Sequence, residues 1–294
     1  MRVDNAIIMA AGTSSRFAPL SYEKSKALIE VRGEILIERQ IRQLKEAGIK
    51  EIIIVTGYKA DRFEYLREKY NVALVHNPFY LTRNNNSSIY YAKEYLKNSY
   101  ICSSDNYFIT NPFESEVDDS YYSAVYADGE TNEWCITEEN GWIKNVKVGG
   151  HDSWVMLGHV FWSESFSQSF VRILEEEYDK PETANKLWEA IFIEHINELP
   201  MKIRKYPNDF IFEFDTLDEL REFDTTYINN TRSEIIKYVA EKLGCAERDI
   251  TSIKPAKNNS NMADGFEFEK NDRTYIYCYG TKELREYYYG KNNC

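Results

Sequence analysis

The first 108 residues alternate between short apolar runs and amphipathic segments, and this alternation constrains the fold more than any other feature. The pattern predicts strands at 6–9, 51–58, 72–77 and 99–108, and helices at 34–47, 59–70 and 87–97. Continuous apolar runs are typical of strands that are buried on both faces. Strands that alternate with helices predict a mainly parallel sheet with helices on both faces, as in Rossmann-like α/β folds.

The pattern changes after about residue 119. Three strand-like pieces follow, YYSAVYADG, EWCITEENGWIKNVKV and WVMLGHVFWS, and the pair Asn140-Gly141 predicts a turn. We expect helices at 164–178 and 181–196, and then a short strand that ends at Asp215, with Thr216 or Asp218 as the cap of the next helix. Residues 229–294 predict a small α+β appendage, with a helix at 232–243 followed by a hairpin in DGFEFEKNDRTYIYCYG.

The composition limits the partners of the chain. Its net charge of -12 argues against a nucleic-acid-binding protein or one that binds an anionic membrane, because both need a basic face. No stretch approaches eighteen consecutive apolar residues and no signal peptide is evident, so we expect a cytoplasmic protein without a membrane span. The five cysteines are odd in number and lack metal-ligand spacing, which favours free thiols.

A loop of small residues follows the first predicted strand. Residues 10–15 read AAGTSS, and such a loop exposes backbone N–H groups that can wrap a polyphosphate. Arg16 and Lys26 follow, and both side chains suit phosphate oxygens. The loop is neither a Walker loop nor GxGxxG, and an ordinary strand-to-helix turn with surface cations is an equal alternative.

Carboxylates stand where two further strands are expected to end. Asp105 lies near the end of the fourth predicted strand, at the same sheet edge as the loop, where it can hold Mg²⁺. Glu213 and Asp215 are a second pair of acidic residues, at the end of the short strand expected before the helix cap. A turn aspartate and a helix cap explain these residues equally well.

These motifs together resemble the nucleotidyltransferases that couple an NTP to a phosphorylated small molecule. The opening segment MAAGTSSRFAPLSYEKSKALIEV is similar to their N-terminal signature, and the chain looks most like the bacterial CTP:phosphocholine cytidylyltransferases. The shared motifs run in order through VTGY, NNNSSIYYAKEYL, SSDNYF, TNEW, GHVFW, KLWEAI and FEFDTLDEL, over about residues 3–224. The resemblance implies a nucleotidyltransferase domain at 1–228, with a nucleotide-binding half at 1–115 and an acceptor-binding half at 116–228.

Four serines depart from the family pattern. Ser14 stands at the second glycine of the loop and Ser15 at its threonine, while Ser25 replaces the proline before Lys26. Ser103 replaces an aspartate of many relatives, which leaves Asp105 as the expected metal ligand.

The resemblance also implies roles for individual residues. Arg16, Lys26 and Asp105 would be catalytic, and Mg²⁺ would be held by Asp105 and Asp215. The nucleotide would be bound by Ala10, Ala11, Gly12, Gly57, Tyr58, Asn85 and Ser88. The reaction so implied is transfer of CMP from CTP to phosphocholine, which gives CDP-choline and pyrophosphate.

The acceptor half must then recognise a quaternary ammonium group, which favours aromatic faces because it has no N–H donors. The candidate choline ligands are Glu133, Trp134, Trp162, Trp188 and Glu189. For each single tryptophan, a place in the core is the stronger alternative.

Other functions remain open at this point. The acceptor can instead be phosphoethanolamine or 2-aminoethylphosphonate, and an inactive nucleotide-binding regulator is an alternative from another class. The appendage resembles the opening hairpin of a choline-kinase-type domain, but the sequence ends before a kinase catalytic loop, so we expect no kinase activity.

Overall fold

A computed structural model describes residues 1–258 and 263–286 of the chain. The chain forms two compact units, each built from two stretches of sequence. Unit 1 comprises residues 1–12 and 36–213, and unit 2 comprises residues 13–35 and 214–294. This division differs from the predicted boundary at 228/229, because residues 13–35 and 214–228 group with the appendage.

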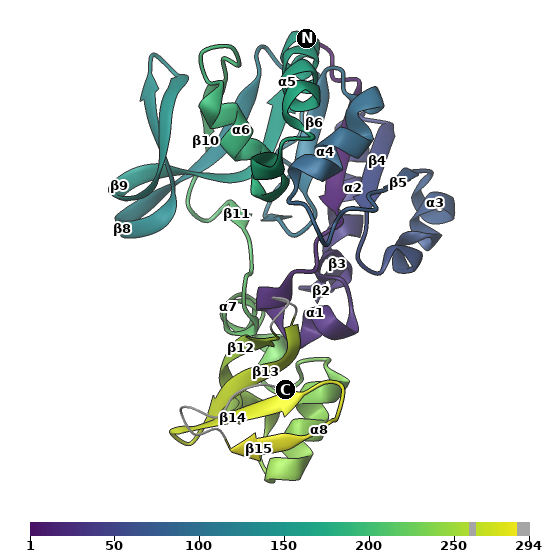
Figure 1. Cartoon of the computed structure of the whole chain (residues 1–294), viewed down its shortest axis with the longest axis vertical. Helices are drawn as coiled ribbons and strands as arrows, with labels where there is room; N and C mark the ends of the chain where they lie inside the picture. The colour runs from purple at the N-terminus through teal and green to yellow at the C-terminus, as the bar shows by residue number, and fades with distance from the viewer. Residues whose placement is uncertain (259–262, 287–294) are drawn as a thin grey trace. The chain divides into compact units, whose positions relative to one another are not determined.

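Unit 1 is built around a seven-stranded sheet in the order β10-β8-β9-β6-β1-β4-β5 (Figure 1). Its strands are β1 (Asn5–Ala10), β4 (Glu51–Thr56), β5 (Ala73–His76), β6 (Ser99–Ser103), β8 (Tyr121–Glu139), β9 (Trp142–Trp162) and β10 (Lys202–Lys205). Strands β6, β1, β4 and β5 are parallel, whereas β9 runs antiparallel to both β6 and β8. The predicted mixed, mainly parallel α/β sheet is confirmed.

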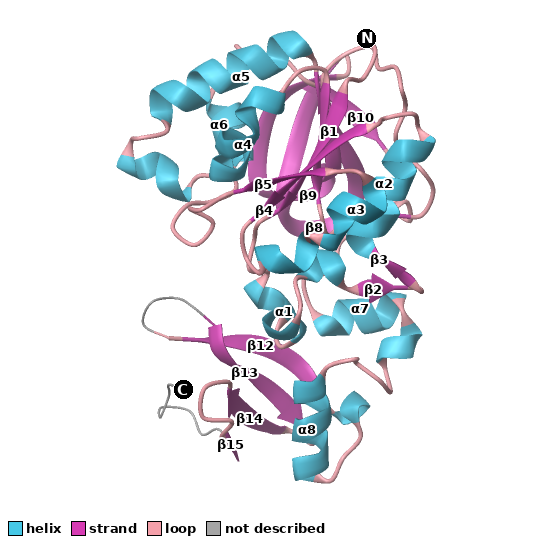
Figure 2. Cartoon of the chain, turned by 90° about the vertical axis from the view of Figure 1, so that its right-hand side faces the viewer, coloured by secondary structure: helices cyan, strands magenta, loops and turns pink. Residues whose placement is uncertain are grey.

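Helices cover both faces of this sheet (Figure 2). Helices α4 (Asn86–Ala92), α5 (Glu164–Glu177) and α6 (Trp188–Glu194) cover one face, and α2 (Leu36–Glu46) and α3 (Tyr65–Tyr70) cover the other. On the first face, Ile7, Ile53 and Ile101 of the sheet share one hydrophobic cluster with Phe170 of α5 and Phe192 of α6. Burial on both faces therefore explains the continuous apolar runs of the parallel strands.

The long hairpin β8–β9 departs from the predicted strand pattern. Instead of three separate pieces, the sequence forms two long strands that extend away from the parallel strands (Figure 1). Its turn lies at Asn140-Gly141, where both residues have positive φ angles of 52° and 80°, as predicted from this pair. Register shifts along the ladder, including one near Gly129, let each strand continue through irregular positions.

Unit 2 combines helices with a four-stranded antiparallel sheet. The sheet contains β12 (Thr251–Lys257), β13 (Ala263–Lys270), β14 (Arg273–Cys278) and β15 (Leu284–Glu286), in that order. Helices α1 (Leu20–Glu23), α7 (Leu217–Phe223) and α8 (Glu234–Leu243) belong to the same unit. The predicted helix and hairpin of the appendage are confirmed.

Long-range contacts explain why residues 13–35 belong to unit 2. The ring of Tyr22 stacks on Tyr279 with 3.8 Å between centroids, and Glu23 accepts a hydrogen bond from the Ile235 amide at 3.1 Å. The buried Arg221 donates to the Ile250 carbonyl at 2.7 Å, which joins α7 to the start of β12. Segments far apart in sequence thus share one core.

The cysteines only partly match the prediction of free thiols. Cys102, Cys135 and Cys245 are free, but Cys278 is disulfide-bonded, so the prediction is wrong for this residue. Cys294 lies outside the described residues. Across residues 1–258 and 263–286, the structure contains no helix of the length and apolarity that a bilayer crossing requires.

Candidate active site

The loop after β1 lies beside the end of β4 in unit 1. The parallel register brings the carboxyl ends of the two strands level, and the Tyr58 amide donates to the Ala11 carbonyl at 3.0 Å. Ala10 and Ala11 are buried, whereas Gly12 is exposed, and a methyl group on Gly12 would meet no described heavy atom within 4 Å. Backbone groups at this edge are thus accessible to a phosphate.

Gly57 fills a position where no side chain fits. A Cβ atom on this residue would lie 2.7 Å from Cβ of Tyr80 and 2.9 Å from the Ala11 carbonyl oxygen. The glycine therefore lets Tyr80 pack directly against the backbone at the end of β4. This contact holds the segment after β5 against the predicted nucleotide-binding edge.

Asp105 lies in the turn that follows β6, at the same edge of the sheet. The predicted strand 99–108 is interrupted here, since β6 ends at Ser103 and β7 (Tyr107–Phe108) begins a separate two-stranded ladder with β11 (Ile211–Phe212). Asp105 is half-buried, and its neighbour Asn106 donates to Glu213 Oε2 at 3.2 Å. The turn thus places Asp105 next to Asn106, which is hydrogen-bonded to the Glu213 carboxylate.

Asn85 joins the predicted nucleotide-binding and acceptor-binding halves. Its Oδ1 accepts a hydrogen bond from the Trp188 amide at 2.7 Å, and its Nδ2 donates to Glu189 Oε2 at 3.1 Å. Ser88 is buried and accepts a hydrogen bond from Asn77 at 3.2 Å. The structure therefore ties Asn85 to α6 and Ser88 to the end of β5.

Glu189 is the most perturbed carboxyl group of unit 1. Desolvation raises the pKa of Glu189 to about 7, although hydrogen bonds from Asn85 and Tyr122 oppose the shift. Tyr122 donates from its hydroxyl at 3.4 Å, and its ring stacks on Trp188 with 5.8 Å between centroids. These partners are neutral, so a cationic group would supply what the Glu189 carboxylate lacks.

The sequence did not single out Tyr122, because one tyrosine in an aromatic-rich strand carries no pattern. Only the fold shows that β8 and α6 bring its hydroxyl to Glu189.

The candidate tryptophans occupy two kinds of position. Trp162 and Trp188 are 0% and 1% exposed and lie in the hydrophobic core, as the core alternative predicted. Trp134 lies on the β8–β9 hairpin, is partly buried and packs against the same cluster, while Glu133 is exposed. Because a fully buried ring cannot meet a ligand, we leave Trp162 out of the choline contacts proposed below.

Arg16, Lys26 and Asp215 come together in unit 2. Asp215 accepts from Arg16 at 2.6 Å, and Lys26 Nζ lies 3.7 Å from its other oxygen. The Lys26 side chain is only 4% exposed, whereas that of Arg16 is 71% exposed. Asp215 does not cap α7, because the Thr216 side chain does so in a capping box with Glu219. The carboxylate is therefore free to hold the two cations.

Two of the substituted serines adopt the backbone that the family motif requires. Ser14 has φ 48° and ψ 44°, a left-handed conformation that glycine adopts most easily. Ser25 has φ −56° and ψ 137°, which proline also adopts. Both serines thus have backbone angles that the residues of the expected motif, glycine and proline, also adopt.

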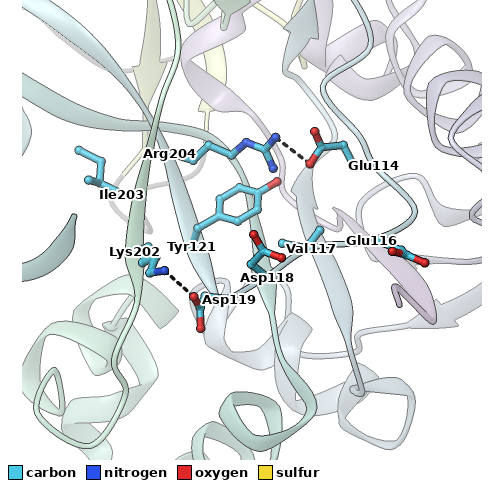
Figure 3. Close-up of a pocket in the computed structure, with 9 residues that line it drawn as sticks. All are labelled: Glu114, Glu116, Val117, Asp118, Asp119, Tyr121, Lys202, Ile203 and Arg204. Carbon is cyan, nitrogen blue, oxygen red and sulfur yellow. Dashed lines mark ion pairs between the residues drawn. The ribbon is translucent and has the colours of Figure 1, made fainter. Parts of the chain in front are cut away.

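A separate hollow of about 380 Å³ lies at the opposite end of the unit 1 strands (Figure 3). It lies near the amino end of β6, because Tyr121 in its wall pairs with Phe161, which pairs with Tyr100. Lys202 and Arg204 in this hollow are paired with Asp119 and Glu114 at 2.5 and 2.8 Å. Two further acidic side chains line it, so the excess negative charge disfavours a triphosphate.

Comparison with known proteins identifies the family. A model of the MobA-like NTP transferase domain matches residues 6–118. Choline-phosphate cytidylyltransferase of Streptococcus pneumoniae is 34% identical over 220 residues, which cover 74% of this chain and 96% of that protein. The chain belongs to the choline-phosphate cytidylyltransferase family.

Two further relatives of the family bear on the acceptor. The 2-aminoethylphosphonate cytidylyltransferase of Lancefieldella rimae is 35% identical over 234 residues, which cover 78% of this chain and 95% of that protein. A solved structure of CTP:phosphocholine cytidylyltransferase from S. pneumoniae matches with a TM-score of 0.73 and 35% identity, and covers 77% of this chain and 99% of that one. Family membership confirms the predicted nucleotidyltransferase class. The three matches cover 74–78% of this chain, so about a quarter of it lies outside them.

Proposed function

We propose that the protein transfers CMP from CTP to phosphocholine and releases pyrophosphate. The observation that carries this proposal is the 34% identity to a choline-phosphate cytidylyltransferase along 96% of that enzyme's length. The sheet edge with the AAG loop and Asp105, and the cationic cluster of Arg16 and Lys26, supply the groups that such a reaction needs.

The chemistry requires alignment and charge neutralisation more than proton transfer. An oxygen of the acceptor phosphate attacks the α-phosphorus of CTP in line, a new P–O bond forms, and the bond to the β-phosphate oxygen breaks so that pyrophosphate leaves with the electron pair. Because a phosphate monoester has a second pKa near 6, the attacking oxygen is already anionic at neutral pH. Preorganised donors and cations then stabilise the developing charge.

The residues divide between two tasks in the nucleotide site. Backbone groups of residues 10–12 cradle phosphate oxygens, while Arg16 and Lys26 neutralise them. Mg²⁺ remains a prediction, and the hard carboxylate oxygens of Asp105 and Asp215 fit it. When bound, the ion would neutralise charge on the triphosphate. Asp215 would have to loosen its ion pairs with Arg16 and Lys26, which could then engage phosphate.

The acceptor site is proposed around Glu189. Its desolvated carboxyl group, bound only by neutral donors, gains a favourable partner when a trimethylammonium group arrives. Tyr122 and Asn85 fix the carboxylate, and the partly buried Trp134 offers an aromatic face for the methyl groups. Trp188 shapes the site from the core through its stack with Tyr122.

A second candidate acceptor is 2-aminoethylphosphonate, because one relative at 35% identity is named for this compound. Its primary ammonium group carries N–H donors, so it would use carboxylate and carbonyl acceptors in place of aromatic faces. Glu189 and the Tyr122 hydroxyl offer such acceptors, whereas a trimethylammonium group gains only from charge and ring contact.

The test is an acceptor comparison with purified protein, CTP and Mg²⁺. We expect pyrophosphate release on addition of phosphocholine, with kcat/KM higher than for phosphoethanolamine or 2-aminoethylphosphonate. A clear preference for an unmethylated amine would overturn the choice of acceptor but keep the enzyme class. CTP binding without turnover of any acceptor would instead favour a regulator. A cytoplasmic location stays a prediction.

A further inference from the structure

We infer that Gln40 of α2 is a positioning residue that fixes the turn carrying Asp105, an inference that rests on the proposed function. The Gln40 side-chain amide donates to the Ser103 carbonyl at 2.8 Å and to the Asn106 carbonyl at 3.4 Å. One nitrogen atom thus binds the chain on both sides of Ser104 and Asp105, the two residues of the turn. The turn cannot open without breaking at least one of these hydrogen bonds.

The burial of Gln40 indicates that its donors are the reason for its presence. The residue is 1% exposed, and its Oε1 atom has no hydrogen-bond partner within residues 1–258 and 263–286. A buried acceptor without a partner destabilises the fold, so an apolar side chain would suit this position better if packing were its only role. Glutamine supplies two N–H donors on one atom, which is what two neighbouring carbonyl groups require.

The same contact explains how the chain leaves the sheet at this point. β6 pairs with β1 as far as Met9 and Ser103, and the Ser104 amide donates to the Met9 carbonyl at 3.3 Å. The chain then turns, and β7 begins at Tyr107. Gln40 binds the carbonyl before this turn and the carbonyl after it, so a side chain of α2 holds the backbone where the regular ladder ends.

A second buried glutamine on the same side of α2 provides an internal comparison. Gln43 is 3% exposed, and its amide donates to the Phe108 carbonyl at 3.3 Å, beyond the turn. Arg39 donates to the same carbonyl at 2.8 Å and to the Ile109 carbonyl at 3.0 Å. Loss of the Gln43 amide would therefore leave the Phe108 carbonyl with a donor, whereas loss of the Gln40 amide would free both ends of the turn.

The position of this turn matters because Mg²⁺ demands near-ideal octahedral geometry from its ligands. Asp105 is half-buried, and the next residue, Asn106, is 2% exposed and donates to Glu213 Oε2 at 3.2 Å. The turn is thus held by Gln40 through its backbone and by Glu213 through the Asn106 side chain. Loss of a group that orients a metal ligand typically costs about 10–100-fold in metal affinity or activity.

The test compares Gln40→Met with Gln43→Met in the full-length protein. Methionine keeps an unbranched side chain and removes the N–H donors. The measurements are the Mg²⁺ concentration for half-maximal activity and the rise in Tm that Mg²⁺ adds in the presence of CTP. Gln40→Met should raise that Mg²⁺ concentration about tenfold and at least halve the Tm rise, whereas Gln43→Met should leave both within about twofold of wild type. Both variants should unfold at similarly reduced urea concentrations, because each loses a buried amide.

Two further variants make the outcome decisive. Gln40→Glu keeps the shape of the side chain but offers at most one donor, so the same rise in the Mg²⁺ requirement is expected even if Gln40→Met fails to fold. Asp105→Asn should abolish the Mg²⁺-dependent Tm rise. If it does so while both Gln40 variants behave like Gln43→Met, the inference is overturned and the proposed function stands. If the wild type releases no pyrophosphate with any acceptor, the proposed function fails and the inference fails with it.

Discussion

Two carboxyl groups, Glu189 in unit 1 and Asp215 in unit 2, have opposite surroundings. Glu189 is desolvated and receives hydrogen bonds only from neutral groups, so its pKa rises to about 7. Asp215 is one-third exposed and is paired with both Arg16 and Lys26. Among residues 1–258 and 263–286, one carboxyl group therefore has no cation partner, and the other holds two.

Under the proposed function, this difference would suit the two groups to ligands of opposite charge. A buried carboxyl group without a cation gains most from a positively charged ligand, because the charge partner relieves its desolvation. A carboxylate paired with two cations holds those cations in place until an anionic ligand replaces it as their partner. Four variants or conditions test this contrast, from the largest expected effect to the smallest.

Lys26→Ala should have the largest effect. Removal of this buried cation leaves Asp215 with Arg16 alone and removes one stabilising charge from the proposed phosphate site. We expect kcat to fall by roughly 10²–10³, as when a single oxyanion donor is lost, while the circular dichroism spectrum stays unchanged. Lys24→Ala, which alters an exposed neighbour, is the control. A fall of less than about fivefold would contradict the assignment of Lys26.

Glu189→Gln should act mainly on the acceptor. The amide keeps the shape of the side chain and its contacts with Asn85 and Tyr122 but has no charge for the ammonium group. We expect KM for phosphocholine to rise by about tenfold or more, with a small change in KM for CTP, because the charge attraction between the carboxylate and the ammonium group is lost. The exposed Glu182→Gln is the control. An unchanged KM for phosphocholine would remove Glu189 from the site.

Acidification should reproduce part of that effect. Because the pKa of Glu189 is about 7, its ionised fraction grows from about pH 6 to about pH 8, and the affinity for phosphocholine should grow several-fold with it. The acceptor phosphate also ionises near pH 6, and Glu189→Gln should retain only that inflection. If wild type and variant gave the same pH profile, the carboxyl group would not titrate in the site.

The same raised pKa has the opposite consequence for folding. The folded state holds the proton on Glu189 more tightly than the unfolded state, whose pKa is near 4.5. The contribution of this group to stability is therefore present below about pH 4.5 and is lost as the pH rises through about 7. Binding at Glu189 and folding thus depend on pH with opposite signs.

Thr216→Ala should have the smallest effect. It removes the side chain that caps α7, while Asp215 keeps its own hydrogen bond to Glu219. We expect the free energy of unfolding to fall by about 1 kcal/mol in urea titrations followed by circular dichroism, and kcat to change less than threefold. Thr225→Ala, at an exposed position of the short 3₁₀ helix Thr225–Tyr227, is the control. A larger loss of activity than of stability would show that the cap also positions Asp215.

The sequence predicted the parallel half of the fold within a few residues. Strands such as β1 and β4 are apolar throughout because both faces are covered, and this signal is local. The turn at Asn140-Gly141 and the cap at Thr216 also follow from local chemistry. By contrast, the end of β6 at Ser103 was missed, since the strand-like residues Tyr107 and Phe108 form a second ladder.

The surroundings of Glu189 and the extent of unit 2 depend on contacts between distant residues. Asn85 reaches Glu189 across 104 positions, and Tyr122 reaches it across 67, so no local pattern predicts either contact. The same is true of Tyr22 and Tyr279, whose stack places an early segment with the appendage. The sequence named Asn85 and Glu189 as candidates, but only the fold showed their surroundings and the contact with Tyr122.

Asn85 has a consequence for the natural variation of this family. The side-chain oxygen of Asn85 accepts a hydrogen bond from the Trp188 backbone amide, and its side-chain amide donates one to the Glu189 carboxylate. A substitution at Asn85, or in the loop that carries it, would shift which amine is preferred without touching the amine. Under the proposed function, the preferred amine in related sequences should therefore vary with the residue at this position.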